Sequence, residues 1–183
     1  MQAIEDLKHE HRIIELVLTA LEHKAERLES GHLLNRDRAE RALEILRNFA
    51  DKCHHGKEER HLFPMLESRG VPRDSGPIGV LLHEHAEGRN HVRAMARAAT
   101  GASEGDPQGG PTFVRHALAY VTLLRQHIQK EEQVLFPMAE QMLGPADDAT
   151  LMAGFEQIER DEVGEGVHEK YHRWAHDLIE QSE

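Results

Sequence analysis

The amino-acid sequence predicts an all-α protein, an up-down-up-down four-helix bundle with an additional C-terminal helical segment. Three observations lead to this prediction. Aromatic residues make up only 4% of the chain, and Ala, Leu, Glu and Arg dominate its long segments. Clusters of glycine and proline cut the chain into pieces of helical length. Within each piece apolar residues recur at spacings of three and four, so each helix has one face to bury.

The breakers give the order of the elements. Five helical segments are separated by turn signals at residues 30–31, 70–77, 101–111 and 144–145. The fourth helix is expected to start near Thr112, and the fifth segment, about 148–181, to bend at Gly164 and Gly166. We therefore expect a four-helix bundle over residues 1–143. A C-terminal helical extension over 147–183 is expected to pack on it.

Composition excludes several classes of function. The chain has 183 residues, enough to bury a core without disulfides, and its only cysteine is Cys53. Acidic residues outnumber basic ones 33 to 22, for a formal charge of -11, which argues against a nucleic-acid partner. No apolar run approaches the roughly 20 residues that a membrane span needs. The N-terminus lacks an apolar signal segment. We expect a cytoplasmic protein with no membrane partner.

The unusual number is 15 histidines. Several histidines and glutamates occupy positions where the periodic pattern of their helix calls for an apolar residue. The polar residues in phase with the buried face are His11, His54, Glu58, His85, His127 and Glu131. His9 and His83 are two positions away from His11 and His85, and residues at i,i+2 do not share a helix face. The phase therefore selects one histidine from each His-Glu-His triplet.

An internal repeat strengthens this reading. Residues 8–11 match 82–85, and residues 54–64 match 127–137, so each of two helical hairpins carries the pattern H…HxxxE. Histidine and glutamate at i,i+4 lie on one helix face and can reach one centre. Carboxylates can bridge two metals and imidazoles can cap them, and these oxygen and nitrogen donors suit iron or manganese better than a structural zinc. Six such groups in a core would be costly without metal. With two bridging carboxylates among the six, we expect two metal ions per chain.

With its two HxxxE motifs, each followed by Leu-Phe-Pro, the chain resembles the hemerythrin-like family, the HHE cation-binding domain, over roughly residues 1–143. The resemblance implies a bundle that holds two non-haem iron ions with an oxo or hydroxo bridge. The implied terminal ligands are His11, His54, His85 and His127, and the implied bridging carboxylates are Glu58 and Glu131.

The sequence departs from the oxygen-carrying hemerythrins, which have HxxxH on the third helix. Here Arg89 stands where the second of those histidines would be, and the fourth helix has HxxxE in place of HxxxxD. This resembles the bacterial and archaeal branch, whose members include sensors, iron-repair proteins and peroxide-handling proteins. It argues against simple reversible oxygen transport.

The function expected from these features is binding of, or reaction with, a small ligand such as dioxygen, nitric oxide or peroxide, in sensing or in oxidative or nitrosative stress. The alternatives are a peroxide-consuming, catalase-like oxidoreductase and iron storage or delivery. The residues do not decide whether the protein is an enzyme. Tyr120, Glu10 and Glu84 are expected to support the ligands by hydrogen bonds.

The C-terminal extension offers one more candidate ligand. The six ligands above are one histidine short of the seven in the oxygen carriers. His168 is in phase with the apolar residues Tyr171, Ala175 and Leu178, so it belongs to the face expected to pack on the bundle. We therefore expect His168, or with less support Glu162, to add a ligand or a supporting contact.

Overall fold

The computed structural model describes residues 1–164 and 167–180, and over these it contains helices and short connections, which confirms the predicted all-α class. The first and third helices of the bundle are α1 (Gln2–Glu29) and α4 (Gly76–Glu104). The second and fourth are composite. Their consecutive parts are α2 (Arg36–Ile45), η1 (Leu46–His55), η2 (Glu58–Leu62) and α3 (Phe63–Ser68), and then α5 (Gly109–Lys130), η3 (Glu131–Leu135) and α6 (Phe136–Met142).

The η segments are wider, π-helical turns, and two of them have an evident cause. Pro64 and Pro137 lack the N–H that an α-helix needs, and the proline ring clashes with the carbonyl four residues earlier. The preceding turn widens, so that Phe63 donates its N–H to the Glu58 carbonyl and Phe136 donates to the Glu131 carbonyl. Each wide turn thus begins at a glutamate predicted to bind metal.

The connection between the third and fourth helices differs from the prediction of a loop over residues 101–111. Helix α4 continues to Glu104 and α5 begins at Gly109, so the connection is 105–108. Gly105 ends α4 with a left-handed φ of 80°, which favours glycine. Gly109 instead allows close packing, because a Cβ there would lie 2.4 Å from the Ala102 nitrogen. Part of the glycine-rich stretch therefore serves helix contact rather than a turn.

The apolar core consists of two clusters of buried side chains at different levels of the bundle. One includes Val17, Phe49 and Tyr120, and the other includes Leu7, Phe63 and Phe136. The predicted ligand His11 lies in sequence between the two sets, one turn after Leu7 and before Ile13. A band of buried polar residues therefore interrupts the apolar interior at mid-bundle.

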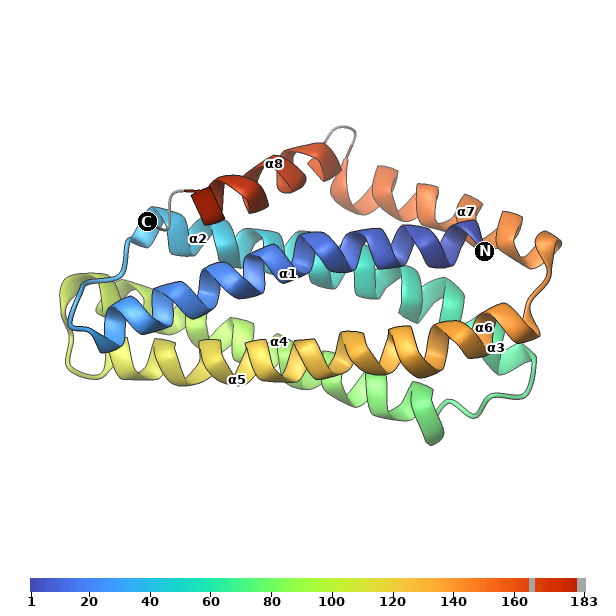
Figure 1. The fold of residues 1–183 in the computed structure, drawn as a ribbon, viewed down its shortest axis with the longest axis horizontal. Coiled ribbons are helices and arrows are strands. Elements are labelled where there is room, and N and C mark those ends of the chain that lie inside the picture. Colours follow the sequence, from blue (N-terminus) through green and yellow to red (C-terminus); the bar gives the residue numbers. More distant parts are fainter. Residues whose placement is uncertain (165–166, 181–183) are drawn as a thin grey trace.

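The C-terminal part consists of α7 (Pro145–Ile158), η4 (Glu159–Val163) and α8 (Val167–Glu180). It lies along α1 and α2, on the side of the bundle away from α4 (Figure 1). Gly164, with a φ of 90°, separates η4 from α8 at the predicted bend. Asp148 of α7 accepts hydrogen bonds from the backbone N–H groups of Gln2 and Ala3. None of the helices in the described part of the chain has the length and apolar character to cross a bilayer.

Candidate metal centre

The residues that the periodicity selects lie together inside the bundle. The six predicted ligands are each 1% exposed or less, and every bundle helix contributes at least one of them: His11, His54, Glu58, His85, His127 and Glu131. The neighbouring histidines, His9 and His83, are exposed. The predicted helix phase therefore separates the buried histidine from the exposed one in both triplets.

The four histidines form two pairs. The Nε2 atoms of His11 and His54 are 3.1 Å apart, and those of His85 and His127 are 3.2 Å apart. The ring centroids of the two pairs are separated by similar distances, 4.7 Å and 4.8 Å. Each pair joins one histidine from each helix of one hairpin, so the sequence repeat is also a repeat in space.

Both glutamates connect the two histidine pairs. Glu58 Oε1 lies 3.7 Å from His54 Nε2, while Glu58 Oε2 lies 3.4 Å from His85 Nε2. Glu131 does the same in the opposite sense, with Oε1 3.1 Å from His127 Nε2 and Oε2 3.1 Å from His11 Nε2. Each carboxylate thus directs one oxygen to each half of the centre, which is the geometry of a bridging ligand.

The outer nitrogen of every histidine contacts a carboxylate. His54 and His127 contact glutamates of their own hairpin, with Nδ1 2.9 Å from Glu10 and 3.0 Å from Glu84. These supporting roles of Glu10 and Glu84 were expected from the sequence. With Nδ1 held in this way, each ring directs Nε2 toward the centre.

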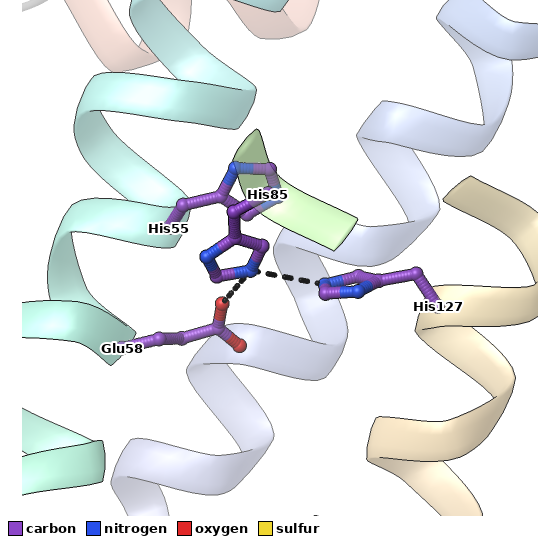
Figure 2. Close-up of side chains that lie close together, drawn as sticks. All are labelled: His55, Glu58, His85 and His127. Atoms are coloured by element: carbon purple, nitrogen blue, oxygen red, sulfur yellow. Dashed lines mark hydrogen bonds and ion pairs between the residues drawn. The ribbon is translucent and has the colours of Figure 1, made fainter. Parts of the chain in front are cut away.

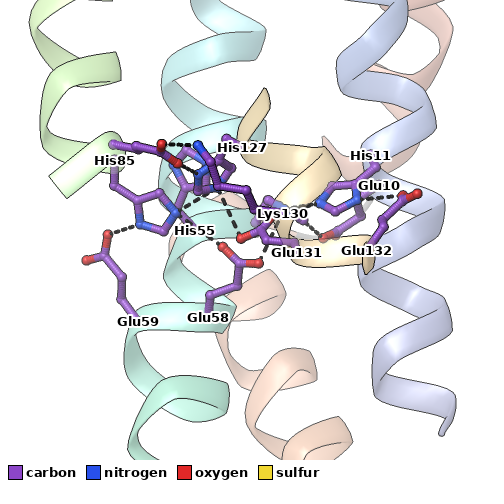
Figure 3. A network of polar contacts seen from close by, with 12 residues as sticks. Glu10, His11, His55, Glu58, Glu59, His85, His127, Lys130, Glu131 and Glu132 are labelled. Carbon is purple, nitrogen blue, oxygen red and sulfur yellow. Dashed lines mark hydrogen bonds and ion pairs between the residues drawn. The ribbon is translucent and has the colours of Figure 1, made fainter. Parts of the chain in front are cut away.

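His11 and His85 contact glutamates of the other hairpin. His11 Nδ1 is 3.0 Å from Glu132, and His85 Nδ1 is 2.7 Å from Glu59 (Figure 3). Sequence reasoning missed Glu59 and Glu132, although both directly follow a predicted ligand in the repeat. Adjacent helix positions face different sides. In each Glu-Glu pair the first carboxylate therefore points into the centre, and the second contacts a histidine on a neighbouring helix.

The centre is electrostatically unbalanced as a purely protein site. The carboxylate oxygens of Glu58 and Glu131 are buried and accept no hydrogen bond within the described part of the chain. Burial and the neighbouring Glu131 carboxylate hold the pKa of Glu58 well above its usual range. Burial would also raise the pKa of Glu131, but His127 and His11 hold it well below that range. Orphaned oxygens beside imidazole nitrogens fit a cation, because a metal ion would satisfy both kinds of donor.

Comparison with known proteins agrees with this geometry. The sequence profile of the Hemerythrin HHE cation binding domain matches residues 2–139. The chain belongs to the hemerythrin HHE family. An Iron-sulfur cluster repair protein YtfE of Edwardsiella ictaluri is 31% identical over 136 residues, which cover 72% of this chain and 59% of that protein. An Iron-sulfur cluster repair protein DnrN of Neisseria gonorrhoeae is 40% identical over 89 residues, covering 45% and 54%.

More distant similarity extends further along this HHE protein. An uncharacterized protein of Mycobacterium tuberculosis, Rv1995, is 26% identical over 163 residues, or 89% of this chain and 63% of that protein. The chain thus spans about three fifths of the length of the curated relatives that it matches over most of its residues. No solved structure matches it.

A fifth histidine at the HHE centre, its seventh polar side chain, was missed by sequence reasoning. His55 is 4% exposed, and it offers a nitrogen to the group formed with Glu58, His85 and His127. Its ring stacks on the His85 ring with centroids 3.8 Å apart (Figure 2). Neither ring nitrogen has a hydrogen-bond partner in the described structure, and burial lowers the pKa of His55 to about 4, so the ring is neutral near pH 7.

The signal for His55 was hidden by the helix geometry. His55 directly follows His54, and the α-helical phase that selected His54 places the next residue about 100° around the axis. Both lie at the end of η1, a π-helical segment. A wider turn changes the angle between successive residues, so the α-helical period did not indicate that two consecutive histidines are buried at one centre.

A buried lysine supports the half of the centre formed by the His11–His54 pair. Lys57 is fully buried, and its Nζ donates to Glu10 at 2.7 Å, to Asp6 at 2.9 Å and to Glu159 at 2.6 Å. Against the effect of burial, Glu10 and the other acidic neighbours raise the pKa of Lys57. Because Glu10 also contacts His54, the lysine connects a predicted ligand to Glu159 of the C-terminal part.

Two other sequence expectations have different outcomes. Tyr120 was expected near His127 as a supporting residue, but it lies against Gly88, where a Cβ would be 3.3 Å from its ring. The side chains of His168 and Glu162, the candidate ligands of the extension, lie outside the described residues. In the region that is described, the extension reaches the centre through Glu159.

Proposed function

We propose that this HHE protein holds two non-haem iron ions, oxo or hydroxo bridged, and binds or reacts with a small ligand such as dioxygen, nitric oxide or peroxide in sensing or stress handling. The observation that carries the proposal is the placement of Glu58 and Glu131. Each offers one oxygen to the His11–His54 pair and the other to the His85–His127 pair. The two histidine pairs and both carboxylates would together hold the two ions, which would use all six side chains.

The protein's own residues orient the site and exclude water. Carboxylates at the four outer nitrogens fix the ring orientation and leave Nε2 available as the metal donor. The Phe136 ring stacks on His11 at 5.5 Å, and the Phe63 ring stacks on His85 at 5.9 Å. These contacts place an aromatic ring against one histidine of each pair. The iron pair, when bound, would supply electrons and an open position for the small ligand.

Metal analysis and spectroscopy test the proposal. Protein loaded with ferrous iron without oxygen and then freed of unbound metal is expected to contain two irons per chain. Exposure to air, nitric oxide or hydrogen peroxide should then change its visible absorption. A charge-transfer band that reverses under vacuum would indicate carriage, and a band that persists would indicate oxidation. A protein that holds one iron, or that accepts zinc and refuses iron, would contradict the two-iron proposal.

A second candidate is iron delivery or repair of iron centres. It is supported by relatives named as iron-sulfur cluster repair proteins, which match part of this chain. The assay is transfer of iron from loaded protein to an iron-depleted acceptor, compared with transfer to a strong chelator. Iron that resists the chelator argues against delivery. Rapid consumption of peroxide by the same loaded protein would instead favour a catalase-like oxidoreductase.

A further inference from the structure

A cavity of about 230 Å³ lies between η1, α4 and α5. It is directly beside the half of the centre formed by the His85–His127 pair. Its apolar wall includes Leu46, Val92 and the ring of Tyr120. Since a water molecule occupies about 30 Å³ in the liquid, the cavity has room for roughly seven waters. That exceeds the space needed by a diatomic molecule and suits a ligand of several heavy atoms.

His55 stands between this cavity and the metal-binding side chains. It belongs to the cavity wall and also to the group of possible donors around Glu58, His85 and His127. Both of its ring nitrogens are buried without a hydrogen-bond partner among the described residues. Leaving a buried polar group unpaired is costly, so these nitrogens indicate a partner that is not part of the protein.

The ring of His55 is not arranged like the predicted ligands. The centroid of its ring is 3.8 Å from that of His85, and the two ring planes are 17° apart. In the His11–His54 and His85–His127 pairs the ring centroids are 4.7 Å and 4.8 Å apart, and the rings are strongly inclined to each other. The nearest carboxylate, Asp51, is 3.6 Å from His55 Nδ1. The stacked position suits a residue that contacts a ligand held beside His85 better than one that binds the metal itself.

The mouth of the cavity is cationic in a chain with a formal charge of -11. Arg47, Lys52 and Arg93 line it, are exposed, and form no ion pair with any described residue. The remaining charges at the cavity are already matched, because Arg89 donates to Asp51 at 2.7 Å and to Glu59, outside the lining, at 2.7 Å. Unpaired positive charge around a partly apolar cavity attracts small anions.

We propose that this cavity admits and binds a small planar oxyanion, of the carboxylate or nitrite type, next to the metal position of His85 and His127, with His55 as its hydrogen-bond donor. The metal part of this inference rests on the proposed function, while the cationic mouth and the unpaired His55 do not. The apolar wall disfavours strongly hydrated multivalent anions, and the volume accommodates a monoanion of a few heavy atoms.

The internal repeat supplies the test variant. Ile128 occupies the position in the second hairpin that His55 occupies in the first, so His55→Ile places the chain's own alternative residue there. Binding of nitrite, acetate and uncharged acetamide is measured by calorimetry and by the absorption of iron-loaded protein. Lys52→Gln and Arg93→Gln test the mouth. Arg97→Gln, one turn further along α4 and outside the cavity lining, is the matched control.

Wild-type protein is expected to bind nitrite or acetate at least about tenfold more tightly than acetamide, and His55→Ile should lose about tenfold in oxyanion affinity. Iron content and the ligand-free spectrum should stay unchanged, and His55→Gln, which keeps an N–H donor, should restore part of the loss. Each mouth substitution should weaken binding about threefold and Arg97→Gln should not. Comparing nitrite with acetate shows which oxyanion the cavity prefers.

Several results would overturn the inference. Equal binding of acetate and acetamide would show that the charge of the ligand has no role. Equal losses of affinity from Arg93→Gln and Arg97→Gln would show that only the overall positive charge of the surface matters, and not the residues at the cavity mouth. Loss of iron from His55→Ile would make His55 a metal ligand instead. Two irons without oxyanion binding would overturn this inference alone. Oxyanion binding that depends on Lys52 and Arg93 in a protein that takes no iron would contradict only the proposed function.

Discussion

The two halves of the centre present equivalent donors on the inside but are covered differently on the outside. In both hairpins a lysine follows the second histidine by three residues and bonds to the glutamate that contacts that histidine. Lys57 is fully buried against Glu159 of the C-terminal part, whereas the Lys130 side chain is 42% exposed. The same motif therefore has a fully buried lysine in the first hairpin and a partly exposed lysine in the second.

The second difference concerns the residue after the paired histidine. It is His55 in the first hairpin and Ile128 in the second, and Ile128 packs in the apolar core while His55 faces the other half of the centre. The cavity lies on the His55 side. Internal symmetry thus explains how two equivalent histidine pairs arise, and the cavity lies where the two hairpins depart from that symmetry.

The largest effect is expected where the two halves are equivalent. Since each bridging carboxylate serves both histidine pairs, Glu58→Ala and Glu131→Ala should each lower iron affinity by more than the roughly 10- to 100-fold typical of supporting residues. Glu59→Ala and Glu132→Ala, which remove supporting carboxylates, are the matched controls. Metal analysis after dialysis measures the loss. Retention of two irons by either bridging variant would contradict the symmetric arrangement.

The covering of the two lysines predicts a large difference in stability. Lys57→Met leaves three carboxylates without their cation and should lower the free energy of unfolding by about 3–5 kcal/mol. Lys130→Met removes a partly exposed ion pair and should cost less than about 1 kcal/mol. Urea unfolding of both variants in the same metal state gives the comparison. Equal losses would show that the C-terminal covering does not distinguish the halves.

A smaller effect is expected from the C-terminal part itself. Glu159→Gln removes one charged acceptor of Lys57 and should destabilise the protein by about 1–2 kcal/mol, with less than a tenfold change in iron affinity. Glu156→Gln, an exposed change on α7, should stay within about 0.5 kcal/mol of the wild type in the same unfolding experiment. A loss in Glu156→Gln as large as that in Glu159→Gln would remove the specific role of the contact with Lys57.

No effect on iron content is expected from the first histidine of each His-Glu-His triplet, which is exposed. His9→Ala and His83→Ala change exposed positions and should leave the iron content at the wild-type value, whereas His11→Ala and His85→Ala should lower it. Metal analysis of the four variants under identical loading conditions measures this. Equal losses within either triplet would mean that the exposed histidine takes part in binding.

The fold class and the placement of the six candidate donors could be predicted from the sequence because they follow from helical phase. The period of 3.6 residues separated His11 from His9, and the repeat doubled the signal. The prediction of a loop over residues 101–111 was wrong because Gly109 serves close helix packing rather than a turn. His55 and Lys57 were missed for another reason: their roles depend on a widened turn and on a distant segment, neither of which appears in local periodicity.

The division of the chain into a bundle over residues 1–143 and an extension over 147–183 remains a prediction, as does ligation by His168 or Glu162. The contact between Lys57 and Glu159 shows why a boundary is hard to read from sequence alone. A charged residue of the extension satisfies a lysine inside the bundle. Composition and breakers identify the helical segments but not which of them share buried charge.

The widened turns also set where the chain can gain or lose residues over evolutionary time. Deleting one residue of η1 ahead of His54 would change the angular position of the donors that follow on that helix relative to the bundle. His54, His55 and Glu58 would then leave the centre together. The connection 105–108 lies on the surface at the far end of α4 and can change length without moving any donor. Among homologous chains, length variation should therefore collect at that connection and be absent from Leu46–Leu62.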